Sequence, residues 1–163
     1  MKLLSAMVCA AVMSAPAFAQ SACEPFDVTS LDGRIIGAVD AGEAGHSIDD
    51  RRVGERPLGD ADGTAIGEAR WSVTLLDPDP NGQSTHNLVK MYFLLDSGTI
   101  LSEGVVAPVG DIHVAETVTV PQFELVILGG TGAFKHARGV IRVFPAADGT
   151  PDELTYKVDI TCT

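Results

Sequence analysis

Two arginines in the segment "HARGVIRVF", Arg138 and Arg142, combine reactive chemistry with a regular spacing. The segment is rich in Val and Ile, which favour a β-strand, and alternation would place both arginines on one face with Val140 and Phe144. On the inner face of a sheet, a guanidinium needs a carboxylate or an anionic ligand, because an unpaired buried charge is costly. On the outer face, the same side chains would form surface ion pairs. The sequence leaves both alternatives open.

Two further polar residues are candidates for a site. Glu103 shares a face with Leu101 and Val105 in "TILSEGVVAP", so it is a candidate acidic partner for an inward arginine. Tyr92, two residues from both Lys90 and Leu94, could present a phenol to a ligand. For these residues too, surface ion pairing or hydrogen bonding in the core is the alternative to a role in a site.

Signatures of metal sites and of common hydrolases are not found in the sequence. The four histidines lack the spacing of metal ligands; they are His46, His86, His113 and His136. The segment "DPDPNGQSTHNL" begins like a calcium-binding loop, but its twelfth position is Leu88 where a bidentate glutamate is required. No nucleophile elbow occurs. We therefore expect no metal site.

The glycine-rich stretch "GGTGAFKHARG", which begins at Gly129, resembles a phosphate-binding loop at first sight. A dinucleotide fingerprint needs glycine at positions one, three and six, followed by a helix. Counted from Gly130, the sixth position is Lys135, and the residues that follow favour a strand. The glycines are therefore predicted to be scaffold, at a tight connection between two strands.

The elements that would position these side chains are short β-rich runs separated by turn residues. Strands are predicted near 34–40, 64–77, 86–96, 99–108, 112–120, 122–128, 137–145 and 153–161. In the last of these, Leu154, Tyr156, Val158 and Ile160 share one face. The stretch 42–63 is polar and glycine-rich and is predicted to be a long loop. The fold class expected is all-β, an eight-stranded antiparallel up-and-down barrel of the calycin-like type.

The first 19 residues predict a secretory signal peptide, with Lys2, an apolar run and a small-residue site ending at Ala19. The mature protein would be one domain, residues 20–163, secreted to the periplasm or the medium. The formal net charge of the full chain, −11, disfavours nucleic acid and anionic membranes as partners. Cys23 and Cys162 would remain in an oxidising compartment, so they are predicted to form a disulfide.

The segment "LGGTGAFKHARGVI" resembles the Gly-Gly-Thr-Gly-x-Phe-x-x-Ala-Arg-Gly signature of the dirigent and allene oxide cyclase-like barrel superfamily. Upstream, "DDRRVGERPLGDADGTAIGEARWSVTLLD" is similar to the family's aspartate-bearing entry loop and the strand that follows it. The resemblance covers roughly residues 49 to 161. It implies an eight-stranded barrel with a hydrophobic cavity, in some members a homotrimer, that works without a metal or an organic cofactor.

The resemblance also implies roles for particular residues. Arg138 matches the arginine that dirigent proteins place in or beside the pocket, and Asp50, or its neighbour Asp49, falls where the entry loop carries an aspartate. The catalytic candidates are thus Arg138, Asp50 and Glu103, with Tyr92 as a ligand-binding candidate.

The leading hypothesis is a secreted barrel that binds a small hydrophobic molecule and directs its cyclisation or isomerisation. The alternatives are a lipocalin-like carrier with a wholly apolar interior and a structural barrel filled by its own side chains.

Overall fold

The computed structural model describes residues 23–30, 33–42, 45, 47–77, 86–107, 121–145 and 153–163. Most of them lie in nine β-strands: β1 (Phe26–Ser30), β2 (Arg34–Val39), β3 (Arg51–Gly59), β4 (Ala65–Leu75), β5 (Asn87–Leu95), β6 (Gly98–Val106), β7 (Phe123–Gly130), β8 (Ala137–Pro145) and β9 (Leu154–Cys162). The single 3-10 turn found among the described residues is Gly132–Phe134.

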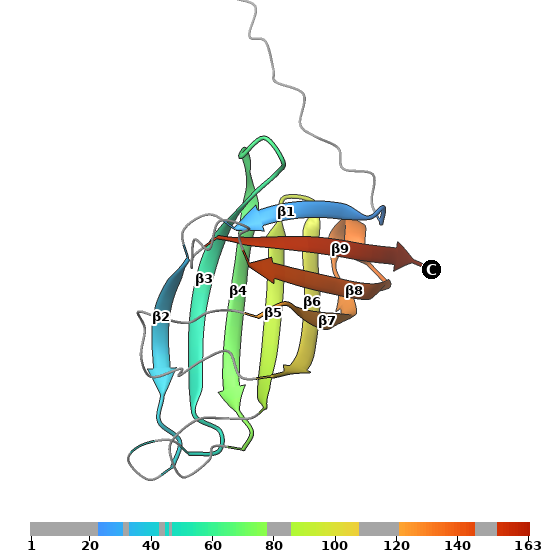
Figure 1. The fold of residues 1–163 in the computed structure, drawn as a ribbon. Coiled ribbons are helices and arrows are strands. Elements are labelled where there is room, and N and C mark those ends of the chain that lie inside the picture. The colour runs from blue at the N-terminus through green and yellow to red at the C-terminus, as the bar shows by residue number, and fades with distance from the viewer. Residues whose placement is uncertain are drawn as a thin grey trace, which may run out of the picture.

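The strands close into an antiparallel barrel. Neighbours follow the order β1-β9-β8-β7-β6-β5-β4-β3, and β1 pairs in turn with β3, which completes a ring of eight strands. The ninth strand, β2, continues along the same edge of β3 beyond the end of β1. In Figure 1, β3 to β6 run side by side along one wall, whereas β1, β8 and β9 run across them. The predicted fold class is confirmed.

The core fills the barrel around one layer of large side chains. Phe93 of β5 and Tyr156 of β9 meet edge to face with ring centroids 5.2 Å apart, so the two walls touch there. Ile100 and Ile127 are fully buried in the same core. The predicted apolar face of β9 is inside as expected, since Leu154, Tyr156, Val158 and Ile160 are all buried.

Two strands were missed by the sequence prediction. Residues 51–59 form β3 where a loop was predicted, because the inward positions of this strand carry Arg52, Gly54 and Arg56 and give no apolar alternation. The short strand β1 was also missed. The predicted strand 112–120 and the segments 1–22, 78–85, 108–111 and 146–152 lie outside the described residues.

The glycine-rich segment is scaffold, as predicted. Gly132 has a φ of +61°, and a Cβ there would lie 2.4 Å from the carbonyl oxygen of Ser97 in the turn between β5 and β6. The segment therefore packs against that turn at a distance that only glycine allows.

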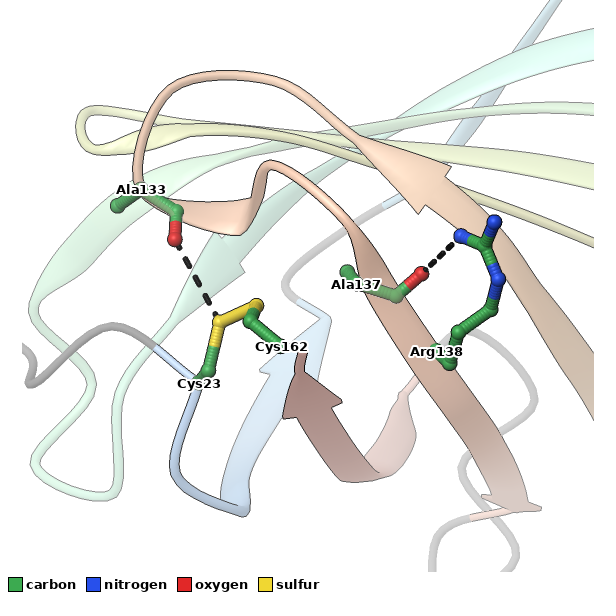
Figure 2. The surroundings of a disulfide bond; sticks show 5 residues. All are labelled: Cys23, Ala133, Ala137, Arg138 and Cys162. Carbon is green, nitrogen blue, oxygen red and sulfur yellow. Dashed lines mark hydrogen bonds between the residues drawn. A yellow bond between two sulfur atoms is a disulfide. The ribbon is translucent and has the colours of Figure 1, made fainter.

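Cys23 and Cys162 form the predicted disulfide, with their Cα atoms 5.5 Å apart and a sequence separation of 139. Figure 2 shows the bridge beside the 3-10 turn, where Sγ of Cys23 lies 3.5 Å from the carbonyl oxygen of Ala133. The bridge thus fastens the start of the described chain to the end of β9. Within the described residues, no helix has the length and apolar character needed to cross a membrane.

Candidate functional site

The inner face of β3 is polar from Arg52 to Arg56 and apolar only at the buried Leu58. Arg52, Gly54 and Arg56 pair across to Val73, Trp71 and Ala69 of β4, respectively. Ala69 is fully buried, and Trp71 and Val73 pack against the core, so this register places both arginines on the inner side of the barrel. The inner side of β3 and β4 therefore carries both charged and apolar side chains: two arginines on β3 and a tryptophan with aliphatic residues on β4.

Gly54 makes room for the indole of Trp71. A Cβ at residue 54 would lie 2.1 Å from Cζ2 of Trp71, so the ring lies directly over the β3 backbone. The indole Nε1 is buried and has no hydrogen-bond partner among the described residues. A donor in this state is free to bind a ligand oxygen, and leaving it unsatisfied costs about 1–3 kcal/mol.

The Tyr156 hydroxyl is a second buried polar group on the inner side. Burial raises the pKa of Tyr156 to about 12, while the nearby Arg56 charge and the Ser30 hydroxyl lower it. Ser30 is itself fully buried and its Oγ accepts a hydrogen bond of 2.8 Å from the backbone N–H of Leu154. The phenol lies near both groups, yet its oxygen makes no hydrogen bond of normal geometry within the described part of the chain. At neutral pH it is an uncharged donor.

Asn87, at the start of β5, carries unpaired polar atoms on another wall. It is fully buried between Leu75 of β4 and Val106 of β6, its cross-strand partners. Neither the amide nitrogen nor the amide oxygen has a partner in the described parts of the protein. Buried side-chain amides are normally hydrogen-bonded, so an isolated one marks a place where a polar guest would be stabilised.

The inner wall is less completely covered near β3 than around Phe93. Trp71 and Val73 are only partly buried although they pack against the core. Phe93 and Ile127, by contrast, have no exposed surface. Arg52 and Arg56 are also only partly buried and share this part of the inner wall, whereas the Nε1 atom of Trp71 is buried.

Of the four site residues predicted from the sequence, only Asp50 is buried. Its carboxylate accepts hydrogen bonds from the backbone N–H of Ala41 at 2.9 Å and of Ser47 at 2.8 Å. Its carbonyl accepts a further bond of 2.9 Å from the N–H of Leu75. These contacts tie the segment before β3 to the end of β4. The neighbouring Asp49 is exposed.

The other three predicted residues lie on the outer face. Nη1 of Arg138 donates to the backbone carbonyls of Leu128, at 2.9 Å, and Ala137, at 2.6 Å, and Figure 2 shows the second bond. Glu103 forms an ion pair of 3.7 Å with Lys90. Tyr92 is 41% exposed. The structure does not bring these residues together with Asp50, and their functional roles stay predictions.

Arg142 shares the outer face with Arg138. Its Nη1 donates to Oδ2 of Asp159 at 2.5 Å, and its Nε lies 3.3 Å from Oε2 of Glu124. The surface ion-pair alternative therefore holds for Arg142. Among the residues that the structure describes, no three His, Cys, Asp or Glu side chains gather to hold a metal ion.

The inward polar residues Ser30, Arg52, Arg56, Trp71, Asn87 and Tyr156 were not predicted as a site. One signal was available: Tyr156 was placed correctly on an apolar strand face, and aromatic side chains with a polar atom need a partner when buried. Arg52 and Arg56 gave no such signal, because their segment lacks the pattern of a strand.

Residues 26–161 match the family model described as the allene oxide cyclase barrel-like domain. The chain belongs to this family. This match confirms the family resemblance predicted from the sequence. The amino-acid sequence by itself matches no curated protein.

Several solved structures share the fold of this allene oxide cyclase-like barrel. A pyocyanin demethylase superposes with a TM-score of 0.59 at 23% identity, over 85% of this chain and 99% of that one. A cyclase described as a nonspecific heme binder that catalyses a [4 + 2] cycloaddition gives 0.55 at 15% identity, over 83% and 62%. A Diels-Alderase from Streptomyces koyangensis gives 0.54 at 13% identity, over 86% and 70%. At these identities the likeness concerns the fold.

Proposed function

We propose that this barrel binds a small hydrophobic molecule in its interior and directs the cyclisation or isomerisation of that molecule without a cofactor. The observation that supports this function is the set of buried, unpaired polar atoms on the inner wall: the Tyr156 hydroxyl, the Trp71 Nε1 and the Asn87 amide. Apolar walls would hold a flexible chain in one conformation, and donors fixed in a dry interior would stabilise charge that develops on a reacting oxygen.

The inner polar groups favour this function over a plain carrier. A carrier would be expected to have an apolar interior throughout, whereas here Tyr156 extends from β9 and Asn87 from β5, the two walls that meet at the Phe93–Tyr156 contact. A purely structural barrel would have apolar side chains packed along its whole length. That description fits the layer around Phe93 but not the partly covered wall with Trp71 and Val73.

Trp71 allows a direct test, because it is the single tryptophan of the chain. An apolar fluorophore that absorbs at the tryptophan emission should quench Trp71 on binding, and small molecules that co-purify with the protein should displace it. Mass spectrometry of the native protein would identify those molecules. Absence of both quenching and co-purifying ligands would refute the proposed function.

A carrier and an enzyme differ in what they release. Isolated ligand incubated with the protein should return as an isomer under the proposed function and unchanged from a carrier. Tyr156→Phe should slow the conversion about 10²-fold if the hydroxyl stabilises the reacting oxygen. Arg138→Gln, on the outer face, tests the role that the family signature suggests for Arg138. An unchanged rate in both variants would contradict both assignments.

We also propose that residues 1–19 direct secretion and are then removed. The disulfide between Cys23 and Cys162 supports an oxidising location, since such bridges persist outside the cytosol. The mature protein recovered from the periplasm or the medium should begin at Gln20. Recovery of an uncleaved protein from the cytosol alone would contradict the proposal.

Self-association into a homotrimer is a further part of the proposal. An outer apolar patch covers β5, β6 and β7; its exposed members are Tyr92, Leu94, Val105, Val126 and Leu128. An exposed apolar face of this kind is typical of protein interfaces. Light scattering should give the mass of a trimer, and Val126→Lys should reduce it. Val39→Lys, at a similarly exposed position on β2, is the matched control.

A further inference from the structure

Strand β1 closes the ring of the barrel through a short contact. It pairs with β9 along Phe26–Thr29, but within the described residues it pairs with β3 only at Thr29 and Ser30. Strands elsewhere in the ring pair over longer stretches; β5, for example, pairs with β4 along the whole of Asn87–Leu95. In Figure 1, β1 runs beside β9 and reaches β3 with its far end. The β1–β3 contact is therefore the narrowest seam of the ring.

The two ends of β1 are held in different ways. Toward its far end, Val28 and Ser30 are buried, and the Ser30 Oγ accepts a hydrogen bond of 2.8 Å from a backbone N–H of β9. Before its start, Glu24 and Pro25 are exposed, and Phe26 is only partly buried. Burial therefore stabilises the far end of β1. Its start has few buried side chains and needs another anchor to stay on the sheet.

The disulfide supplies this anchor. It joins Cys23, just before β1, to Cys162, the last residue of β9, and Figure 2 shows the two side by side. Both cysteines are only partly buried, so a reductant has access to the bridge. Cys23 has a φ of 71°, a left-handed conformation that residues other than glycine seldom adopt. Release of the bridge would let this backbone relax and would free the start of β1.

We propose that the Cys23–Cys162 disulfide is a redox-sensitive clasp on the barrel seam, and that its reduction by a protein dithiol lets β1 separate from β3 and β9. A thiolate of the dithiol attacks one sulfur of the bridge, and the second thiol of the dithiol then resolves the mixed disulfide. Two electrons and two protons pass to Cys23 and Cys162, which become thiols, while the dithiol becomes a disulfide.

Separation of β1 would open the side of the barrel. Val28 pairs with Tyr156 of β9, and both are buried, so solvent would reach Tyr156 through the gap. The contact between Tyr156 and Phe93 does not involve β1, so the central packing of the other strands should persist. The inference does not depend on the proposed binding function, because strand separation can be measured without a ligand.

Hydrogen exchange followed by mass spectrometry tests the clasp. The folded protein is incubated with and without dithiothreitol, and a gain of two labelled thiols reports reduction of the bridge. Peptides that contain Phe26–Ser30 are expected to exchange at least about tenfold faster after reduction. Peptides from β4, β5 and β6 should keep their protection. The emission of Trp71, which lies on β4, should keep its folded value and so distinguish local opening from unfolding.

Variants separate the bridge from the other contacts of β1. The double substitution Cys23→Ser and Cys162→Ser should give fast exchange of β1 with and without the reductant. Val28→Ala removes buried contacts of β1 and should speed its exchange further in the reduced protein. Val105→Ala, at an exposed position on β6, is the matched control and should leave the exchange of β1 unchanged.

Three results would overturn the inference. Unchanged exchange of β1 after reduction would show that burial alone holds the strand. Equal acceleration in all strands, or a Trp71 emission like that in urea, would show that the bridge maintains the whole fold rather than the seam. Thiols that stay unlabelled after treatment of the folded protein would show that a dithiol does not reach the bridge. The proposed binding function is unaffected by these results, since quenching by a fluorophore tests it separately.

Discussion

Tyr156 should titrate far above the usual range of tyrosine, and the stability of the protein should fall with pH as a result. Its pKa is raised from 10.0 to about 12, chiefly because burial disfavours the phenolate. Between these two values the unfolded chain loses a proton that the folded protein keeps. The contribution of Tyr156 to stability is therefore complete below pH 10 and is lost as the pH rises toward about 12. Two pKa units correspond to about 3 kcal/mol.

The chain has two tyrosines, so Tyr92→Phe leaves Tyr156 as the sole source of the phenolate absorbance. We expect this variant to titrate near pH 12 when folded and near pH 10 in denaturant. Urea unfolding at a series of pH values should show a free energy of unfolding that declines above pH 10. In Tyr156→Phe the decline should be smaller by the same amount. A folded protein in which Tyr156 ionises near pH 10 would refute the buried position of its hydroxyl.

Three further predictions concern stability. The disulfide joins two residues that are 139 positions apart in sequence. Its reduction should lower the free energy of unfolding, measured in urea titrations, by about 4–5 kcal/mol. No change would show that the bridge is absent in solution. Gly139→Ala should lower the melting temperature strongly, because the φ of Gly139 is +140° and the new Cβ would lie 2.0 Å from the Asp159 carbonyl oxygen. Gly129→Ala should be tolerated, because the atom nearest to the new Cβ is 3.6 Å away. Equal effects of the two substitutions would contradict this packing. Asn87→Leu should raise the free energy of unfolding by about 1 kcal/mol, because it replaces a buried amide without partners among the described residues by an apolar side chain of similar size. A loss of stability would indicate that the amide is hydrogen-bonded.

The strands with clear alternation were predictable from the sequence. In β9, apolar residues occupy one face only, so both the strand and its inner face could be assigned. In β8, the two faces could not be distinguished, because Ile141 and Val143 alternate with Val140 and Phe144. The structure resolves this through register: Ile141 pairs with Val158 and Val143 with Tyr156, both inward. The arginines of β8 are outward as a consequence.

The same reasoning explains why β3 was missed. Alternation identifies a strand only where the inner face is apolar, and β3 presents Arg52, Gly54 and Arg56 to the interior. Here the pairing with β4 and with β1 and β2 fixes the conformation, although the segment lacks a strand pattern of its own. The prediction therefore failed at the strand that carries the inward arginines.

Failure at this strand is itself informative about function. Buried polar atoms without partners cost about 1–3 kcal/mol each, and a barrel that served only as a scaffold would gain stability by replacing them with apolar side chains. Local departures from the rules of folding are expected at functional sites, where a ligand supplies the missing contacts. The unpaired atoms of Trp71, Asn87 and Tyr156 lie on the inner side, and two of these residues adjoin the arginines of β3. Binding of a polar guest would satisfy these atoms and offset their cost. The features that lower the stability of the barrel are thus the ones that would hold its ligand.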